Sequence, residues 1–196
     1  MGTPDKGIPQ DLLDKAQCAI VVPNLKKAAF VVGGEYGKGF AICRNPNGAG
    51  WGAPAAVKLE GGSVGFQIGG SSTDVVMLVM NRHGMEKLMG DKFTLGADAS
   101  IAAGPVGRTA AAQTDVKMEA EILAWSRTKG LFAGISLNGA KLGPDKDEDR
   151  TLYGRDVTHR EILNGGMRAP SGGNDLAAAL DKYSMNGTPN AERTKR

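Results

Sequence analysis

Residues 31–40 read VVGGEYGKGF, and the interpretation of this stretch decides between two fold classes. Four glycines and one lysine follow an apolar pair, as in the phosphate-binding loop of nucleotide enzymes. That loop requires the pattern G-x-x-x-x-G-K-[ST] between a strand and a helix. Here Gly33 lies one residue too close to Gly37-Lys38, and Gly39 occupies the position of the hydroxyl that binds Mg²⁺. The apolar FAIC that follows is typical of a strand, so the stretch predicts two strands joined by a sharp turn at the glycines.

Strand-like segments continue on both sides of this stretch. Short apolar or alternating runs are separated by Gly, Pro and Asn, which is typical of strands and turns. Asn47-Gly48 is suited to a hairpin. Residues 92–103 alternate between apolar and polar side chains and predict one long strand. Residues 115–130 favour a strand over a helix, and another strand is expected over 130–140.

Helical segments are few and short. The pattern predicts helices over 9–17, 83–90, 151–166 and 176–183, and a charged loop over 142–151. Without the strand–helix–strand rhythm of a doubly wound sheet, the chain is predicted to be α+β and β-rich. We expect mostly antiparallel sheets in a sandwich or barrel-like arrangement, with a few short flanking helices. Residues 1–165 form the predicted domain, and 166–196 a tail with one short helix and a partly disordered polar end.

The composition excludes several classes of protein. The chain has 196 residues, 41% of them hydrophobic, and no run reaches the ~18 apolar residues of a membrane-spanning helix. A net charge of +3 is far below what nucleic-acid-binding proteins concentrate on one face, so no nucleic-acid partner is expected. Cys18 and Cys43 match no metal or redox motif. Buried thiols are the favoured interpretation, and one disulfide is the alternative that an exported protein would permit.

Candidate catalytic and metal sites fail on their sequence context. GGSVG at 61–65 matches the nucleophile elbow of serine hydrolases, and His159 follows it in a permitted order. An elbow needs a helix after Ser63, whereas the next residues alternate as in a strand. DKDED at 145–149 lacks the ligand spacing of an EF-hand, which favours a solvated loop over calcium binding. We therefore expect no enzyme activity, metal or cofactor, and a serine hydrolase using Ser63 is the weaker alternative.

Six longer sequence segments, in order along the chain, resemble the SYLF domain family. They cover about residues 8–165 and read IPQDLLDKAQCAIVVPNLKKAAFVV, WGAPAAVKLEGGSVGFQIG, TDVVMLVMN, FTLGADASIAAGPVGR, SRTKGLFAGISLNGA and YGRDVTHREIL. The resemblance implies a non-enzymatic lipid-binding module that associates with anionic or phosphoinositide-type membrane surfaces. Actin-binding members of the family imply the alternative, a protein-interaction or scaffolding module.

The sequence of these segments is similar to that of stand-alone bacterial members, many of which resemble exported lipoproteins. This resemblance implies a membrane-associated protein of the periplasm or outer membrane. Family members carry a helical segment before the Ile8-Pro9 motif, where this sequence has MGTPDKG. We therefore expect that a signal, a lipidated cysteine or an amphipathic helix has been removed.

Basic residues within the matching sequence segments are the candidates for binding lipid head groups. Lys and Arg form charge-assisted hydrogen bonds to phosphate, and an anionic membrane surface strengthens the attraction. A structural role is the alternative for each, such as a solvated turn or the capping of backbone carbonyls. The partners implied are an anionic phospholipid membrane and a protein. The candidate residues are Lys26, Lys27, Arg108, Arg127 and Lys129.

Overall fold

The computed structural model describes residues 7–30, 32–47, 50–63, 69–107 and 119–184, whose strands join into one sheet. β6 and β7 are parallel, and the other described strand pairs are antiparallel. The order is β5-β9-β3-β2-β1-β4-β7-β6, and β8 also pairs with β7. This arrangement confirms the β-rich α+β fold. The strands are β1 (Cys18–Phe30), β2 (Val32–Cys43), β3 (Ala55–Ser63), β4 (Gly69–Val79), β5 (Phe93–Thr94), β6 (Ile101–Ala103), β7 (Ile122–Thr128), β8 (Leu131–Gly134) and β9 (Lys141–Pro144).

The glycines of the opening stretch lie inside β2, so the prediction that they form the turn is wrong. β1 has an irregular register between Val21 and Lys26, where the backbone bulges toward β2. A Cβ atom on Gly39 would lie 2.0 Å from the carbonyl oxygen of Val21, and one on Gly37 would lie 2.6 Å from Val22. These glycines therefore permit a close approach of two strands rather than a change of direction.

Residues 92–103 do not form one strand, because the chain turns between Leu95 and Ala99. Gly96 has a φ of +89°, and the carboxylate of Asp98 accepts a hydrogen bond from the Thr94 amide at 2.7 Å. The two halves become β5 and β6, at opposite edges of the sheet. One short segment thus connects both edges, which curls the sheet around the side chains of one face.

The remaining strand predictions hold only in part. β7 confirms a strand over 122–128, and β8 confirms the start of the one expected over 130–140. Residues 115–118 and the Gly48 of the expected hairpin lie outside the described residues.

The helices are α1 (Gln10–Lys15), α2 (Arg82–Leu88), α4 (Lys146–Tyr153), α5 (His159–Glu161), the π-helix η2 (Ile162–Gly166) and α6 (Asn174–Tyr183). α1, α2 and α6 confirm three predictions. The charged loop over 142–151 is wrong, since β9 ends at Pro144 and Asp145 caps α4 by accepting from the Glu148 amide. The single helix over 151–166 is also wrong. Gly154 ends α4 with a φ of +71°, and a capping box of Thr158 and Glu161 starts a new helix.

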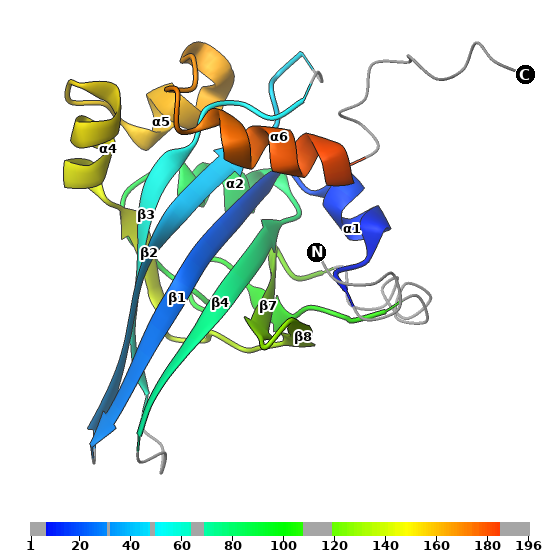
Figure 1. The fold of residues 1–196 in the computed structure, drawn as a ribbon, viewed down its shortest axis with the longest axis vertical. Helices are drawn as coiled ribbons and strands as arrows, with labels where there is room; N and C mark the ends of the chain where they lie inside the picture. The colour runs from blue at the N-terminus through cyan, green and yellow to red at the C-terminus, as the bar shows by residue number, and fades with distance from the viewer. Residues whose placement is uncertain (1–6, 31, 48–49, 64–68, 108–118, 185–196) are drawn as a thin grey trace, which may run out of the picture.

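The two faces of the sheet carry separate hydrophobic cores. The inner face, which includes Ile20, Val57 and Met77, packs against α2 and the curled edges of the sheet. The outer face, which includes Ile42, Leu78 and Trp125, packs against α1 and α6. Figure 1 shows α6 lying across the upper part of the outer face while β1, β2 and β4 continue well beyond it. No helix within the described residues has the length and apolar character needed to cross a membrane.

Cys18 and Cys43 face each other across β1 and β2 and form a disulfide in the inner core. The favoured prediction of buried thiols is therefore wrong. Their Cα atoms lie 4.0 Å apart because the strand register places the two residues directly opposite. A separation of 25 positions could not reveal this pairing without the register.

Candidate interaction surface

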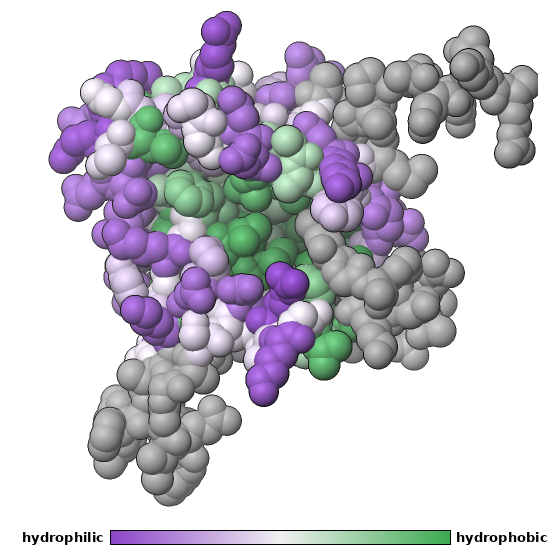
Figure 2. Space-filling view, viewed as in Figure 1, coloured by the Kyte–Doolittle hydropathy of each residue, from purple (hydrophilic) through white to green (hydrophobic). Residues whose placement is uncertain are grey.

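Helices cover only part of the outer face. The row closest to α1 and α6 is fully buried and consists of Ala19, Ile42, Leu78 and Leu123. In the next row, Phe40, Val21 and Val76 face one another across β2, β1 and β4, and all three are only half-buried. We call these three residues the apolar band. Figure 2 shows hydrophobic surface in the middle of this face, next to α6 and bordered by hydrophilic side chains on the side of α4.

Charged residues follow the apolar band along the strands. Lys38 on β2 lies directly opposite Lys58 on β3, an arrangement that is repulsive without a compensating acid. Asp145 supplies it: its carboxylate lies 2.9 Å from Nζ of Lys38 and 3.4 Å from Nζ of Lys58. At the other end of the row, β4 and β7 contribute a facing acid and base. We call this row the charged rim: Lys38, Lys58, Asp74 and Arg127.

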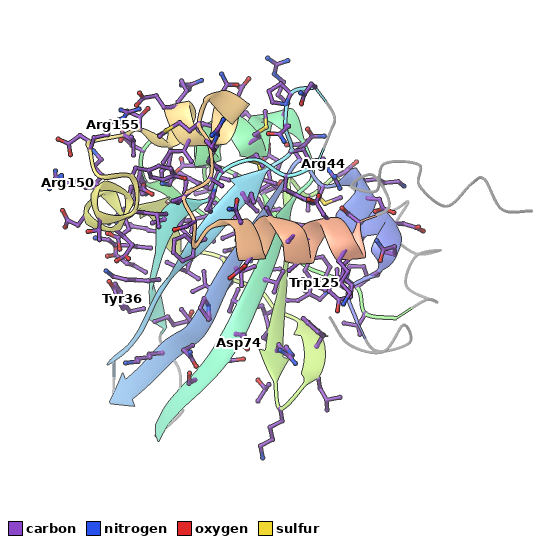
Figure 3. All side chains as sticks on the ribbon, turned by 45° about the horizontal axis from the view of Figure 1, so that its top comes forward. Tyr36, Arg44, Asp74, Trp125, Arg150 and Arg155 are labelled. Carbon is purple, nitrogen blue, oxygen red and sulfur yellow. A yellow bond between two sulfur atoms is a disulfide. The ribbon has the colours of Figure 1, made fainter. Side chains whose placement is uncertain are left out.

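Figure 3 shows the order of these rows along the strands. Trp125 lies near α6, whereas Asp74 lies farther along β4. The Asp74 carboxylate accepts a hydrogen bond from the amide of Asn24 at 3.1 Å, which helps to hold the bulge in β1. The charged rim therefore borders the apolar band on the side away from α6.

Asp145 is an almost fully buried carboxylate that remains ionised. Burial alone would raise its pKa. The hydrogen bond from Lys38, the Glu148 amide and the charge of Lys58 outweigh burial and hold the pKa of Asp145 below its ordinary value. Asp145 thereby anchors α4 to the outer face through two lysines.

A second acid of α4 replaces a missing strand next to β3. β9 ends at Pro144, so the backbone of Ala56 has no further strand partner on that side. The Ala56 amide donates to the carboxylate of Asp149 at 2.7 Å, and its carbonyl accepts from the Asp145 amide at 2.9 Å. The Asp149 side chain and the Asp145 amide together satisfy the backbone hydrogen-bonding groups of Ala56 at the edge of β3.

His159 completes this buried network. Nε2 lies 2.9 Å from the Ala56 carbonyl and 3.3 Å from the Asp149 carboxylate, and Nδ1 lies 3.2 Å from the Leu88 carbonyl. Carbonyl oxygens only accept, so both ring nitrogens must donate and the imidazole is charged. Burial would lower the pKa of His159, but Asp149 and the two carbonyls raise it above its ordinary value.

Tyr153 fixes the end of α4 to the same strand. Its hydroxyl donates to the carbonyl of Pro54 at 2.5 Å. Burial, with the charge of Asp149, raises the pKa of Tyr153 to about 12. We call Asp145, Asp149, Tyr153 and His159 the β3 clamp, because all four hold α4 and α5 against β3 or the residues just before it.

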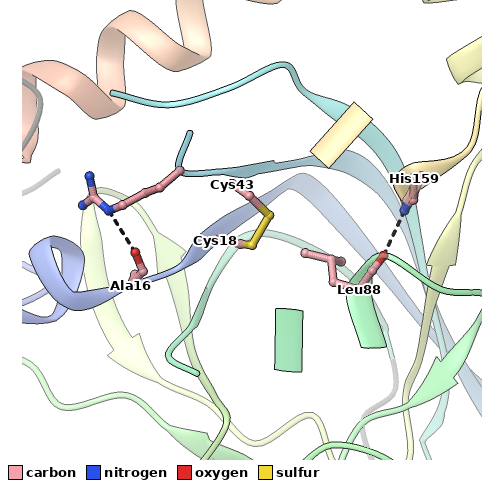
Figure 4. Close-up of a disulfide and its surroundings, with 6 residues drawn as sticks. Ala16, Cys18, Cys43, Leu88 and His159 are labelled. Carbon is pink, nitrogen blue, oxygen red and sulfur yellow. Dashed lines mark hydrogen bonds between the residues drawn. A yellow bond between two sulfur atoms is a disulfide. The ribbon is translucent and has the colours of Figure 1, made fainter. Parts of the chain in front are cut away.

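Arg44 fastens the helices that cover the outer face. Its Nε donates to Ala16 at 3.0 Å and its Nη2 to Leu13 at 2.9 Å, both carbonyls at the C-terminal end of α1. The guanidinium lies 4.3 Å from the centre of the Trp51 ring, and the Trp51 indole donates to Ser184 after α6 at 3.2 Å. Figure 4 shows the disulfide between the Arg44–Ala16 and the His159–Leu88 hydrogen bonds.

The structure brings two of the predicted head-group residues onto one face. Lys26 and Arg127 are exposed on the outer face, and within the described residues neither has an ion pair. Lys129 lies at the turn between β7 and β8, with a φ of +50°. The side chain of Lys27 and all of Arg108 lie outside what the structure describes.

The Ser63–His159 pair that a serine hydrolase would need does not fit this fold. Ser63 is the last residue of β3, and His159 contacts Ala56 near its first. Seven residues of strand separate these positions, which is about 23 Å at 3.3 Å per residue. A general base must lie within hydrogen-bond reach of its nucleophile, so His159 cannot serve Ser63.

The sequence did not reveal the two acids of the β3 clamp, Asp145 and Asp149, because DKDED at 145–149 predicts a solvated loop. A signal was present: Asp145-x-x-Glu148 matches the pattern that starts a helix, and Asp149 lies four residues after Asp145 on the same helix face. The carboxylates of Asp145 and Asp149 are buried and contact cations or backbone groups of the chain, which does not fit a calcium-binding loop. The described residues also contain no group of three His, Cys, Asp or Glu side chains that could hold a metal ion.

The fold defines a curled β-sheet domain in which helices cover one face only in part. Residues 60–183 match the Ysc84 family, described as "Las17-binding protein actin regulator". The chain therefore belongs to the Ysc84 family, which corresponds to the SYLF resemblance found in the sequence.

Several relatives are similar over nearly the whole chain. An SH3 domain-containing protein of Schizosaccharomyces pombe is 36% identical over 182 residues, which is 91% of this chain and 42% of that protein. SH3 domain-containing YSC84-like protein 1 of Bos taurus is 33% identical over 199 residues, which is 98% of this chain and 58% of that protein. LAS seventeen-binding protein 3 of Saccharomyces cerevisiae is 32% identical over 188 residues, which is 94% of this chain and 40% of that protein. The chain thus spans about half the length of these relatives.

Proposed function

We propose that this domain is a protein-interaction module of the actin-regulator type. The observation that carries the proposal is the half-covered outer face, where the apolar band lies open to a partner between α6 and the charged rim. Contiguous apolar surface of this kind often marks an interaction site. The family description and the names of the relatives, which mention Las17 binding and SH3 domains, support a protein partner.

The buried titratable groups support a non-enzymatic role. Asp145, Asp149 and His159 pair with lysines, with backbone groups or with one another. A catalytic acid or base needs a free position from which to reach a substrate. These three residues instead hold α4 and α5 against the sheet.

Sedimentation with purified actin filaments tests the proposal. We expect the chain to pellet with filaments in the absence of lipid and to saturate as filament concentration rises. A protein captured from the native compartment at high salt, without lipid, would identify a different partner of the same module. The proposal is contradicted if the chain stays in the supernatant with filaments and captures no protein under these conditions.

Association with anionic membranes is a second candidate function. Its support is the pair of exposed cations, Lys26 and Arg127, which share the outer face and have no ion pair within the described residues. Co-sedimentation with anionic and neutral liposomes tests it. We expect binding to anionic liposomes that falls in Lys26→Glu and Arg127→Glu, with the exposed Arg160→Glu on α5 as a control. Equal binding to both kinds of liposome, or none, argues against this function.

Export to an oxidising compartment stays a prediction, and the Cys18–Cys43 disulfide supports it. Blocking free thiols at the moment of cell lysis tests the pairing in the native compartment. We expect both cysteines to be protected from the blocking reagent. Two alkylated cysteines would point to a reducing compartment.

A further inference from the structure

α6 shows how this sheet binds a helix. Leu180 is buried, and Leu176 and Ala177 are half-buried, at the helical spacing that places them on the face toward the outer core. The opposite face of α6 is exposed, and Figure 1 shows the helix crossing the strands rather than running along them. The row of sheet residues below α6 is therefore covered by helix side chains that lie three or four positions apart in the sequence.

The apolar band has the dimensions to bind a second helix in the same way. Phe40, Val21 and Val76 come from three adjacent strands and lie directly opposite one another. Neighbouring strands are separated by about 4.8 Å, and successive turns of a helix by about 5.4 Å. A helix that crosses the strands next to α6 can therefore place one apolar side chain, at i, i+4 and i+7, on each of these three residues.

The charges beside the band select the composition of such a helix. The charged rim and its neighbour Lys26 supply four cations, Lys26, Lys38, Lys58 and Arg127. Three described carboxylates contact this row: Asp145, shared by two lysines, Glu148, which lies 4.0 Å from Nζ of Lys38, and Asp74, which accepts from a backbone amide. Among the described side chains, the four cations exceed the three carboxylates along this border by one. A bound helix is favoured when the flank that faces the rim is acidic.

The shape of the surface favours a rod over a flat bilayer. The strands of the band pass beneath α6 (Figure 1), and Asp175 and Lys182 of this helix are exposed. A planar membrane that approached this face would meet these charged side chains before it reached the half-buried band. A helix about 10 Å wide can instead lie in the angle between α6 and the sheet.

We infer that the apolar band and the charged rim bind an amphipathic helix of a partner protein, with an acidic flank, in a position alongside α6. The inference rests on the proposed protein-interaction function and assigns it a surface and a class of ligand.

A synthetic peptide supplies the direct test. The probe is a fluorescent helical peptide of about 15 residues with leucines at i, i+4, i+7 and i+11 and glutamates on one flank. Two comparison peptides carry lysines in place of the glutamates, or the same residues in scrambled order. Fluorescence anisotropy should show saturable binding of the acidic peptide. We expect binding weaker by about tenfold or more for the lysine peptide and for the scrambled peptide.

Variants of the chain locate the binding surface. Phe40→Asp places a charge in the band and should weaken binding of the acidic peptide by about tenfold or more. Arg127→Glu reverses an exposed charge of the rim and should reverse the preference between the acidic and the lysine peptide. Leu131→Asp is the matched control, because Leu131 is an apolar residue of β8 that is 60% exposed and lies outside the band. It should leave the affinity unchanged within about twofold.

The outcomes separate the inference from the function on which it rests. If the chain pellets with actin filaments but binds the three peptides equally or not at all, the inference is wrong and the proposed function stands. Binding that survives Phe40→Asp and Arg127→Glu in folded protein, checked by thermal unfolding, also overturns the inference. Loss of anionic-liposome binding in these variants, without peptide binding by the wild type, would assign the surface to lipid instead. Failure in both the filament and the partner-capture experiments would count against the function itself.

Discussion

The two faces of the sheet differ in how completely they are covered. On the inner face the sheet curls around its own side chains, and residues such as Ile20, Val57 and Met77 are 0% exposed. On the outer face α1 and α6 bury one row fully and leave the apolar band half-buried. Burial of apolar surface is the main favourable contribution to folding. The comparison therefore assigns stability chiefly to the inner face and to the β3 clamp, and the proposed binding to the outer face.

The β3 clamp should give the largest effect on stability. Asp149→Ala removes the acceptor for the Ala56 amide and leaves the charged His159 buried without its counter-ion. Breaking one partner of a buried pair typically costs 3–5 kcal/mol, so we expect a loss of about this size in the free energy of unfolding. Urea denaturation measures it.

Asp147→Ala on the same helix is the matched control. Asp147 is exposed, and its 3.7 Å contact with Arg150 is a surface ion pair. We expect its substitution to change stability by no more than about 0.5 kcal/mol. Similar losses in the two variants would show that the buried network contributes no more than surface charge does.

Removal of the disulfide should give the next largest effect. Cys18 and Cys43 enclose a loop of 25 positions, and closing a loop of this length in the unfolded chain stabilises the fold by roughly 3 kcal/mol. Urea denaturation with and without reductant should show a loss of this order. The double variant Cys18→Ala/Cys43→Ala should be insensitive to reductant. A wild-type chain with the same midpoint in both conditions would contradict the expectation.

The pH dependence of stability should reveal the charge of His159. Its folded pKa is raised above the ordinary value of about 6.5, so its stabilisation is fully present below that pH and is lost as pH rises through the folded pKa. Asp145 acts in the opposite direction: its pKa is lowered, so its stabilisation is lost as pH falls below about 4. Thermal unfolding should therefore show higher stability at pH 5.5 than at pH 8.5.

His159→Gln is the control for this pH profile. Gln keeps hydrogen-bonding capacity but cannot carry a charge, so the difference between pH 5.5 and pH 8.5 should become smaller. An unchanged difference in the variant would assign the pH dependence to other groups.

The sequence predicted local structure better than long-range register. Alternation in Val57–Leu59 and the continuous apolar run Val75–Val79 were enough to predict strands with buried residues. It could not show that Cys18 faces Cys43 or that Lys38 faces Lys58, because those contacts depend on which strands pair and in what register. Pairing between strands is a tertiary property, and a chain with this many glycines leaves several registers possible.

The candidate surface was harder to predict for a similar reason. The family resemblance predicts Lys26 and Arg127 as candidates, and the fold places them on one face. Phe40, Val21 and Val76 belong to apolar runs that look the same as core strands, and only the packing of α6 on the neighbouring row shows that these three residues are less completely covered. Partial coverage of a face cannot be read from alternation, because inner and outer residues of these strands are equally apolar.

Two neighbouring valines on β4 provide the finest test of the comparison between faces. Val75 points to the inner face and is 0% exposed, whereas Val76 belongs to the apolar band and is half-buried. Val→Thr keeps the shape of the side chain and adds one hydroxyl. At position 75 the hydroxyl enters an apolar core, and we expect a loss of about 1–3 kcal/mol. At position 76 it can reach water, and the expected loss is below about 1 kcal/mol. Urea denaturation of both variants measures the difference, and equal losses would mean that the outer band is as closed as the inner core.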